Sequence, residues 1–581
     1  MPHHPHPEDD ALPSFDIRDI PFSRRGAWID LSPVIGLHRS ADDIHLVSHT
    51  TGMHPVFRLT PTRQGQRIDT TWHADPATLR WEHDGATVVA AVFADDDLVR
   101  IRGDGVDLLL ADPADGLTPF SGSYLFRDPV DGGHVLTSYE TGRRYRVSVL
   151  RGEVSAEGSE ALGAGARSLT VSAASAGGWE ISIAELTSAG PAGEDPRDFA
   201  ALAAASAREF ADYLGALAPW RDATSVDAVP LAAYVLWSAT VAPSGFVRRE
   251  SVLMSKHWMD KVWSWDHAFN AIALAPGHPD AALDQFLAPF DHQDAAGALP
   301  DSITHSEVLY NFVKPPIHGW ALRALRDRLA RPLSVVELSD VYEHLERWTR
   351  FWLDHRRAPG SALAHYQHGN DSGWDNATTF DRDRVIESPD LAAFLIVQLD
   401  VLADLAHELG RETPRWRHER DRIATALARD LRDEQGFCAR GVLSRREAPR
   451  TSLLTLLPIV LGDALSQDDA EALRDRLMGH LTEWGLATQR PDTQQYESDG
   501  YWRGPIWAPP TMLIEDGLRR AGFADLADEV SLRFRRLCER SGFAENFDAL
   551  SGEGLRDRAY TWTASVYLVF ARDAASRGTE R

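Results

Sequence analysis

The chain has 581 residues, and its 60 basic residues against 86 acidic residues give a formal charge of −26 at pH 7. A nucleic-acid-binding protein needs a surplus of Lys and Arg, and the sequence has no basic run. The most apolar stretch, Leu453 to Leu461, is interrupted by Thr455 and Pro458 and falls short of the roughly 20 residues of a membrane-spanning helix. We therefore expect a globular protein that binds neither nucleic acid nor membranes.

The composition also bears on location and cofactors. Only two cysteines occur, Cys438 and Cys538, too few for a disulfide framework or a cysteine zinc site. Residues 1–14 carry no basic or apolar signal region and are interpreted as a disordered leader. The acidic positions in residues 128–133 are too sparse for a calcium loop. We expect a cytoplasmic protein without cofactor or metal, and the sequence leaves its oligomeric state open.

The first third of the chain has the pattern of short β-strands. Ala86 to Asp112 predicts three strands with turns at residues 95–97 and 103–105, and Trp179, Ile181 and Ile183 alternate with polar or small residues. This pattern predicts an antiparallel β-sandwich domain over residues 15–196. A helical linker over residues 197–228 is expected to follow, with its helix from about Phe199 to Leu217.

From residue 229 the apolar residues follow the helical period. Ser388 and Pro389 are typical of a helix start, and Gly410 of a helix end. About twelve helices are predicted, without intervening strands, beginning near residues 229, 260, 279, 315, 338, 388, 413, 451, 466, 504, 523 and 560. Twelve helices make six hairpins, and in a closed ring of hairpins the connecting loops gather at one end, where a pocket can form.

Tryptophan is concentrated in this helical region, because 13 of the 18 lie beyond residue 230. Several fall in expected loops next to carboxylates, and indole rings stack on the apolar faces of sugars. Core packing is the commoner role for any single Trp. The cluster as a whole therefore indicates a carbohydrate site more strongly than its members do.

Four loop segments carry the candidate residues, and each has a structural alternative. Asp266 could cap a helix, Asp375 could form an Asx-turn, and Glu545 could be a solvated surface charge. The candidates, in chain order, are Trp263, Trp265, Asp266, Asp301, Lys314, Trp374, Asp375, Trp502, Arg503, Trp507 and Glu545.

The strings SGWDN, KPP, YWRGPIW, ENFDALSGEG and TWTAS together resemble the motif set of glycoside hydrolase family 63 and its trehalase and mannosylglycerate hydrolase relatives. The resemblance covers about 350 residues, from the WSWD segment to the C-terminus. It implies a catalytic (α/α)6 barrel over residues 229–575, so the expected fold combines an N-terminal β-sandwich with a C-terminal all-α barrel. The N-terminal region is similar to the family only in general type.

The resemblance further implies inverting hydrolysis of an α-glycosidic bond. Asp375 would be the general acid and Glu545 the general base, a pair that in such enzymes stands about 6.5 to 9.5 Å apart. Trp265 and Asp266 match positions that hold the innermost sugar. Pocket-lining segments contain Asp301, Lys314, Trp502, Arg503 and Trp507, and the rings of Trp263 and Trp374 adjoin them.

Three departures from the family pattern bear on the substrate. Asp371 stands where the family commonly has Glu, residues 377–379 replace a Ser-Pro-Arg run, and Lys314 replaces a glutamine of trehalases. The expected function is an exo-acting α-glycosidase for a small α-glucoside or α-mannoside, either an oligosaccharide or a glycosylated compatible solute. The alternatives are a glycoside phosphorylase on the same barrel, although no Gly-rich anion loop is present, and a non-catalytic carbohydrate-binding protein.

Overall fold

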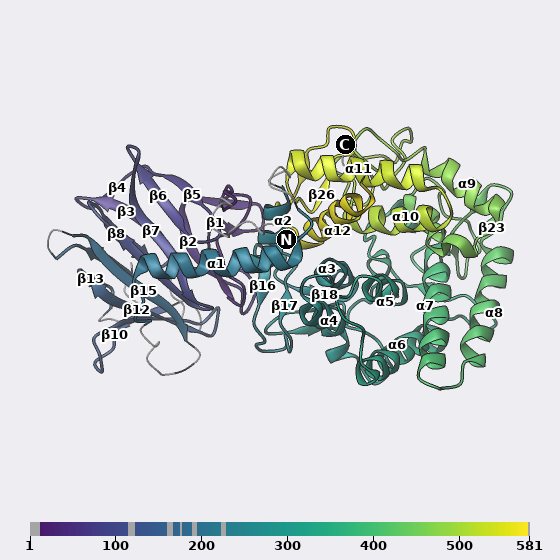
Figure 1. Ribbon diagram of the computed structural model, residues 1–581, viewed down its shortest axis with the longest axis horizontal. Helices are drawn as coiled ribbons and strands as arrows, with labels where there is room; N and C mark the ends of the chain where they lie inside the picture. The colour runs from purple at the N-terminus through teal and green to yellow at the C-terminus, as the bar shows by residue number, and fades with distance from the viewer. Residues whose placement is uncertain are drawn as a thin grey trace, which may run out of the picture. The chain divides into compact units, whose positions relative to one another are not determined.

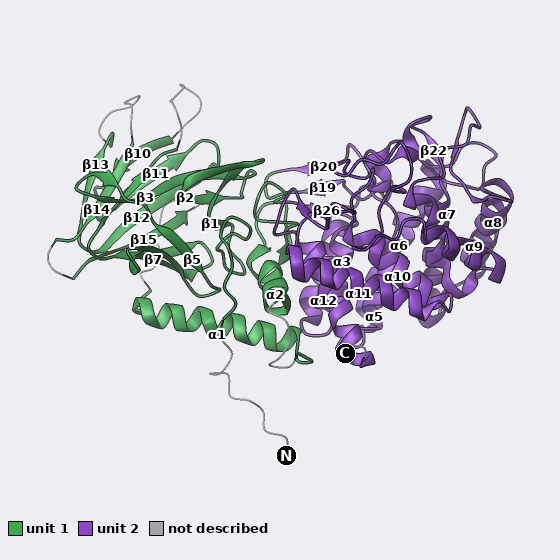
Figure 2. Cartoon of the chain, turned by 90° about the horizontal axis from the view of Figure 1, so that it is seen from above, with its two compact units in different colours: residues 1–260, 304–306 green, residues 261–303, 307–581 purple. Residues whose placement is uncertain are grey.

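A computed structural model describes residues 12–113, 123–159, 167–174, 177–186, 188, 195–221 and 228–578. The chain forms two compact units: Met1–Asp260 with Thr304–Ser306, and Lys261–Ile303 with Glu307–Arg581 (Figure 2). Eleven of the fourteen residues interpreted as a leader lie outside the described part. The predicted domain boundary lies before residue 229, whereas the contacts group residues 229–260 with the first unit.

Two antiparallel sheets make up most of the first unit (Figure 1). The seven-stranded sheet contains β1 (Ile29–Gly36), β2 (Arg39–Ser48), β3 (His54–Arg63), β4 (Gln66–Arg67), β9 (Asp107–Ala111), β13 (Glu153–Glu157) and β14 (Ser168–Ser172). The eight-stranded sheet contains β5 (Thr71–Ala74), β6 (Leu79–His83), β7 (Ala86–Asp95), β8 (Leu98–Gly103), β10 (Ser123–Arg127), β11 (His134–Ser138), β12 (Arg144–Arg151) and β15 (Trp179–Leu186).

The three strands predicted between residues 86 and 112 are confirmed as β7, β8 and β9. The three strands do not all pair with their neighbours in the chain. β7 and β8 pair with each other, whereas β9 pairs with β3 and β14 in the other sheet. The turn at residues 103–105, where Gly105 has a φ of +70°, therefore carries the chain from one sheet to the other.

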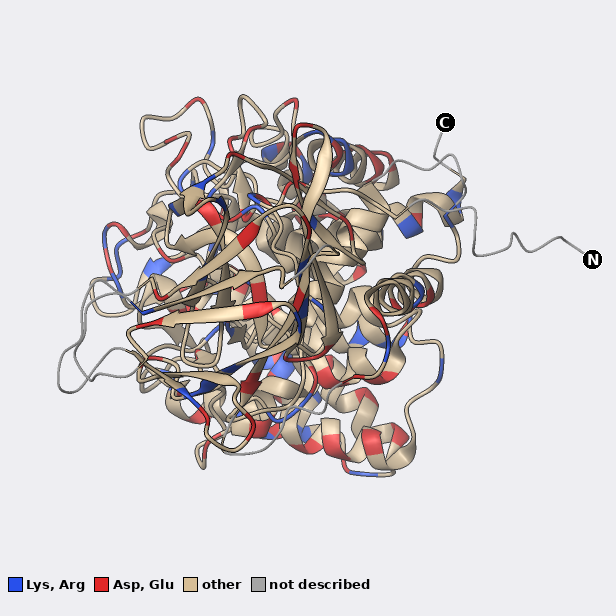
Figure 3. Ribbon diagram, turned by 90° about the vertical axis from the view of Figure 1, so that its left-hand side faces the viewer, with Lys and Arg blue, Asp and Glu red and all other residues tan. Residues whose placement is uncertain are grey.

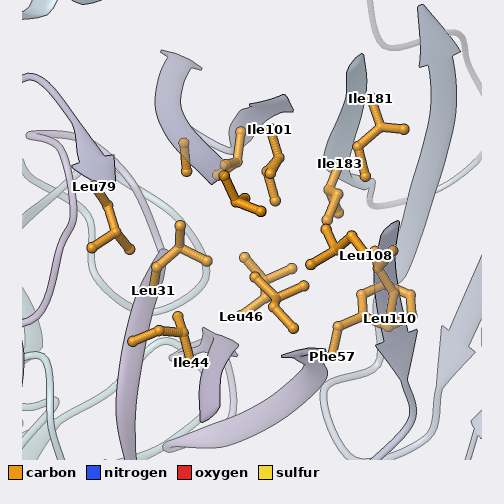
Figure 4. Close-up of a cluster of buried hydrophobic side chains, with 14 of the residues drawn as sticks. Leu31, Ile44, Leu46, Phe57, Leu79, Ile101, Leu108, Leu110, Ile181 and Ile183 are labelled. Carbon is orange, nitrogen blue, oxygen red and sulfur yellow. The ribbon is translucent and has the colours of Figure 1, made fainter. Parts of the chain in front are cut away.

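Both sheets contribute to one apolar core. Leu31, Leu46 and Leu110 of the first sheet and Ile101 and Ile183 of the second belong to the same buried cluster. Figure 4 shows these side chains converging from strands of both sheets. In β14 buried residues alternate with half-buried ones, so one face of that strand points to this core, whereas β1 and β7 are buried on both faces over most of their length.

The predicted linker helix is confirmed as α1 (Phe199–Leu217), which begins at the N-cap Asp198. The Asp198 side chain accepts a hydrogen bond from the N–H of Ala201 and so satisfies one of the free amides of the first turn. Phe199 and Leu202 of α1 pack on Ala90 and Val92 of β7. The helix thus covers an apolar patch of the eight-stranded sheet.

The remaining elements of the first unit follow α1. They are α2 (Ala228–Ala239), β16 (Thr240–Val241) and β17 (Ser251–Val252).

Helices dominate the second unit. They are α3 (His267–Leu274), α4 (Pro279–Leu287), η1 (Ala288–His292), α5 (His318–Arg326), α6 (Val335–His355), η2 (Gly369–Ser372), η3 (Thr378–Phe380), α7 (Pro389–Glu408), α8 (Pro414–Asp430), η4 (Leu453–Ala464), α9 (Gln467–Leu477), α10 (Ala508–Arg520), α11 (Ala524–Ser541) and α12 (Thr561–Arg577).

Six of these helical segments contact one another in a closed cycle. α3 contacts α5, α5 contacts α7, α7 contacts η4, η4 contacts α10, α10 contacts α12, and α12 contacts α3. A second helix packs on the outside of several members, as α4 does on α3, α8 on α7 and α11 on α10. Successive helices therefore pack as pairs in the second unit.

Most predicted helix starts lie within four residues of the observed ones, but the start near residue 260 is wrong. There α3 begins at His267, because residues 262–263 form a short strand. The expectation that no strands occur is also wrong. Two-residue strands pair within the loops: β18 (Val262–Trp263), β19 (Ser302–Ile303), β20 (Val308–Leu309), β21 (His365–Tyr366), β22 (Ile386–Glu387), β23 (Arg432–Asp433), β24 (Gly436–Phe437), β25 (Arg440–Gly441), β26 (Asn546–Phe547) and β27 (Gly554–Leu555).

Charged residues of both signs are interspersed along the elements, as Figure 3 shows. In the part of the chain that the structure describes, no helix is both long enough and apolar enough to cross a membrane.

Candidate functional site

All eleven predicted site residues lie in the second unit, on loops that join its helices. An aromatic cluster forms the centre of this region. The ring of Trp502 stacks on Trp507 at 4.0 Å between centroids and lies 4.7 Å from Trp374 and 6.4 Å from Trp265. Trp374, Trp502 and Trp507 are each 1% exposed, so these rings pack chiefly against one another.

Three further aromatic residues join the cluster and were missed in the sequence. Trp562 lies 5.9 Å from Trp265, Tyr501 lies 4.9 Å from Trp507, and Tyr560 lies 5.0 Å from Trp562. Tyr501 and Trp562 belong to the YWRGPIW and TWTAS strings, so membership in those strings was the signal available.

A buried ion pair lies between two of the loops. The Nζ of Lys314 is 3.0 Å from Oδ1 of Asp301 and donates a hydrogen bond to the carbonyl of Asn370 at 3.1 Å. Burial lowers the pKa of Lys314, but the carboxylates of Asp375, Asp301 and Asp266 outweigh it and raise that pKa overall. The cation is therefore held in its charged form by the acids around it.

Asp266 occupies the N-cap position of α3, but its side chain makes no capping hydrogen bond. Among the described residues, its Oδ2 is buried without a hydrogen-bond partner. Burial raises the pKa of Asp266 to about 8, Lys314 opposes the rise, and Asp301 and Asp375 add to it. The capping alternative therefore does not account for this side chain, whose free oxygen is available to a ligand hydroxyl.

Asp375 is half-buried and follows Trp374 directly. Burial raises the pKa of Asp375, the Lys314 ammonium opposes this rise, and the Asp301 charge adds to it. A carboxyl with a raised pKa retains its proton to higher pH, as a general acid requires.

Glu545 is only 1% exposed, so it is not a solvated surface charge. Its backbone N–H donates to the carbonyl of Asp557 at 2.7 Å, which fixes the start of β26. Neither carboxylate oxygen has a hydrogen-bond partner within the described ranges. Burial raises the pKa of Glu545 to about 8, and the charge of Asp557 adds to the rise, while Arg556 and the Tyr501 hydroxyl oppose it.

Tyr501 connects the two candidate catalytic residues. Burial raises the pKa of its hydroxyl well above the usual range, and the charges of Glu545 and Asp375 both add to this rise. Both carboxylates therefore lie close enough to this phenol to influence its charge state.

An open cavity of about 480 Å³ adjoins Asp375. Arg382, Arg384, Arg503 and His368 are among the residues that line it. Arg503 is paired with Asp381, and its Nε donates to the carbonyl of Asn376 at 2.8 Å. This predicted residue thus lies at the edge of the cavity rather than in the aromatic cluster.

The last predicted residue, Trp263, is half-buried in β18, where it pairs with Ser302 beside Asp301. Asp371, one of the departures from the family pattern, has a structural role. Its carboxylate accepts hydrogen bonds from the N–H groups of Val313 and Gln367 and from Arg356. It thereby ties the loop of Lys314 to the loop of Asp375.

Comparison with known proteins identifies relatives of the second unit. The model of the mannosylglycerate hydrolase MGH1-like glycoside hydrolase domain matches residues 259–563. The chain is 24% identical over 397 residues to a mannosylglycerate hydrolase of Rubrobacter radiotolerans, covering 53% of this chain and 89% of the relative. It is 22% identical over 409 residues to a glucosylglycerate hydrolase of Mycolicibacterium hassiacum, covering 53% and 91%.

Solved structures show a similar fold. A family 63 mannosylglycerate hydrolase from Thermus thermophilus, in complex with Tris and D-glycerate, matches with a TM-score of 0.52 at 20% identity, covering 59% of this chain and 99% of that one. A bacterial glucoamylase in complex with acarbose matches with a TM-score of 0.61 at 10% identity, covering 97% of this chain and 94% of that one. The resemblance to family 63 is thereby confirmed, and the chain belongs to the mannosylglycerate hydrolase MGH1-like glycoside hydrolases.

Proposed function

We propose that this glycoside hydrolase cleaves a small α-glucoside or α-mannoside with inversion at the anomeric carbon, with Asp375 as general acid and Glu545 as general base. The observation that carries the proposal is a pair of carboxyl groups on separate loops: Asp375 lines the 480 Å³ cavity, and Glu545 is buried with both oxygens unpartnered among the described residues. Both groups also have raised pKa values. An inverting mechanism uses two carboxyls on opposite sides of the sugar with a water between them.

The environment of Asp375 suits proton donation to a leaving group. Its raised pKa keeps the proton on the carboxyl, and the 480 Å³ cavity beside it gives the departing group a path to solvent. The Lys314 charge limits the rise, so the proton remains transferable.

Glu545 has the free acceptor oxygens that a general base needs. Both are buried without a partner in the described part of the chain, so a water in the site would donate to them. Because burial raises the pKa of Glu545 to about 8, the base loses its proton as the pH rises toward that value. We therefore assign the acidic limb of the pH–rate profile to Glu545.

The sugar itself would be held by the buried polar group around Lys314. Asp266 and Asp301 offer carboxylate oxygens to adjacent hydroxyls, and Lys314 donates. Trp265 supplies the apolar wall of this subsite.

The fold that carries these residues is, we infer, a β-sandwich followed by an (α/α)6 barrel. The core shared by two sheets, the closed cycle of helix contacts and the likeness to the glucoamylase over 97% of this chain support that inference. The predicted domain limits, 15–196, 197–228 and 229–575, remain part of the proposal.

The leaving group is proposed to carry a carboxylate, as glycerate does. Two relatives are named for mannosylglycerate and glucosylglycerate. In the cavity beside Asp375, the carboxylate of Asp381 is paired with Arg503 and that of Asp383 with Arg446. Arg384 is exposed and makes no hydrogen bond or ion pair with the residues that the structure describes. Its guanidinium is therefore available to an anion.

Two variants test the catalytic assignment. Asp375→Asn is expected to lose about 10² to 10⁴ in kcat on an α-glycoside with an alcohol leaving group, but much less on the matching α-glycosyl fluoride, which needs no proton. Glu545→Gln is expected to lose activity on both substrates. Full activity of both variants on the alcohol glycoside would contradict the assignment.

The leaving-group proposal is tested separately. Wild-type enzyme and Arg384→Gln are compared on α-glucosylglycerate and α-glucosylglycerol, and the same pair of α-mannosides. We expect the wild type to prefer the glycerate compound and Arg384→Gln to raise KM for that compound alone. Equal use of both compounds by the wild type would overturn the carboxylate preference without affecting Asp375 or Glu545.

A further inference from the structure

Arg556 faces the candidate base across the end of a small hairpin. In this hairpin Asn546 of β26 pairs with Leu555 of β27. Glu545 comes directly before Asn546, and Arg556 comes directly after Leu555, so the two residues occupy opposite positions where the pairing ends. The N–H of Glu545 donates to the carbonyl of Asp557, one residue beyond Arg556, so Arg556 is an extra residue in the pairing at this end of the hairpin.

The guanidinium of Arg556 connects three segments around that base. Its Nη1 donates to Oδ1 of Asn546 at 2.8 Å, and its Nη2 lies 2.7 Å from Oδ1 of Asp499. The guanidinium carbon is 4.9 Å from the ring centroid of Tyr501, a cation–π geometry. One side chain thus joins the residue next to Glu545, the start of the 499–503 loop and the Tyr501 phenol.

The backbone at both ends of this contact is in the left-handed region. Arg556 has a φ of 63° and Tyr501 a φ of 62°, and non-glycine residues adopt such angles only when their surroundings compensate. Strain of this kind concentrates at functional sites, where it fixes the direction of a side chain. Here it is found in two residues that touch each other and flank the same carboxylate.

Of the groups whose charges and hydrogen bonds act on the pKa of Glu545 in the described part of the chain, Arg556 is the cation. Asp557 lies on the same hairpin and adds negative charge, Tyr501 comes from the 499–503 loop, and Tyr560 precedes α12. Burial and Asp557 raise the pKa of Glu545, whereas Arg556 lowers it. A base in this position works only as a carboxylate, so the cation opposes the protonation that burial favours.

We propose that Arg556 is a positioning residue for the hydrolysis: it holds Tyr501 and Asn546 beside Glu545 and places its positive charge near the Glu545 carboxyl. The proposal rests on the assignment of Glu545 as the base. Arg556 does not touch the sugar in this account and acts through its neighbours.

The experiment compares kcat and KM across pH for Arg556→Asn, Arg556→Lys and a matched control. Asn tolerates the left-handed conformation, so Arg556→Asn removes the guanidinium with little change in backbone preference. The control is Arg445→Asn, because Arg445 is also an arginine with positive φ, at 57°, and pairs with Glu387 away from Glu545. Thermal unfolding and circular dichroism of each variant establish that it is folded.

We expect Arg556→Asn to move the acidic limb of kcat/KM upward by about one pH unit, since removing an opposite charge raises a carboxyl pKa. At a pH below the limb, such as pH 7, this shift corresponds to about a tenfold loss of kcat/KM, which we expect in kcat because KM should change little. Arg556→Lys should keep the limb near its wild-type position, because the charge remains, but should lose part of kcat, because an ammonium cannot span Asn546 and Asp499 together. Arg445→Asn should match the wild type.

A folded Arg556→Asn with the wild-type limb and kcat would overturn the proposal. If Arg556→Asn does not fold, Arg556→Lys becomes the test of the positioning role. A kcat and an acidic limb of kcat/KM equal to those of the wild type would overturn that role. A reduced kcat with an unchanged acidic limb would support it. Glu545→Gln distinguishes a failure of the role of Arg556 from a failure of the assignment of Glu545 as the base. If that variant is inactive while Arg556→Asn behaves as wild type, only the role of Arg556 fails, and if it remains active, both assignments fail.

Discussion

The Nζ of Lys314 lies 3.0 Å from Oδ1 of Asp301, and the same ammonium lowers the pKa values of Asp266 and Asp375. One buried cation therefore stabilises the negative charge of three carboxyl groups. One of them, Asp375, is the proposed acid. Its removal is expected to affect the binding of the sugar and the protonation of the acid together, because each carboxyl loses the same compensating charge.

Lys314→Met is predicted to move the alkaline limb of kcat/KM to higher pH. Lys314 lowers the pKa of Asp375, so without it Asp375 holds its proton to higher pH and the acid form persists. KM for the sugar substrate should rise as well. The control is Lys261→Met, at a partly exposed lysine 3.8 Å from Glu307. A limb that stays in place or moves to lower pH in Lys314→Met would contradict the prediction.

Gly319→Ala is predicted to destabilise the second unit. Gly319 in α5 lies against α7, and a Cβ added there would come within 2.4 Å of the Gln398 Cα, a backbone atom that cannot move aside. Overpacking of this kind costs about 1 to 3 kcal/mol or more. Gly215→Ala in α1 is the matched control, because its Cβ would meet no atom within 4 Å and alanine favours the helix. The melting temperature should fall for Gly319→Ala and stay level or rise for Gly215→Ala. Equal melting temperatures would refute the close-contact argument.

The stability of the first unit is predicted to fall at alkaline pH because of His49. Its two ring nitrogens each lie 3.0 Å from a carboxylate oxygen, of Asp260 and of Asp30. Burial lowers the pKa of His49, but these two hydrogen bonds outweigh it and raise the pKa to about 9. Because the folded pKa exceeds the unfolded value of about 6.5, the contribution is complete below that value and is lost as the pH rises through 9.

Thermal unfolding followed from pH 6 to pH 10 checks this. The wild type should lose stability across that window, and His49→Gln should start lower and show a flatter dependence. His73→Gln, at a half-exposed histidine, should follow the wild type. A His49→Gln variant with the full wild-type slope would show that another group titrates.

Local signals in the sequence predicted the helices well. Pro389 begins α7 and Gly410, with a φ of 66°, follows its end, and α1 has the predicted limits. These helix limits depend on a few adjacent residues, and they can therefore be predicted from the local sequence. The segment from Leu453 gave the position of η4, but not its 3-10 geometry around Pro458.

Features that depend on distant residues were not predictable in the same way. The move of β9 into the other sheet, the near-complete burial of Glu545 and the hairpin of β26 and β27 that sets Arg556 opposite it result from tertiary packing. Among the site residues, the aromatic cluster was indicated by composition, whereas Tyr560 had no signal apart from its place before TWTAS.

The most direct test of the account is proton NMR of the reaction with α-glucosylglycerate and α-mannosylglycerate, recorded before the released sugar mutarotates. Inversion by Asp375 and Glu545 predicts that the β-anomer appears first. Initial release of the α-anomer would mean a retaining mechanism, and would contradict the assignment of Glu545 as a base that activates water.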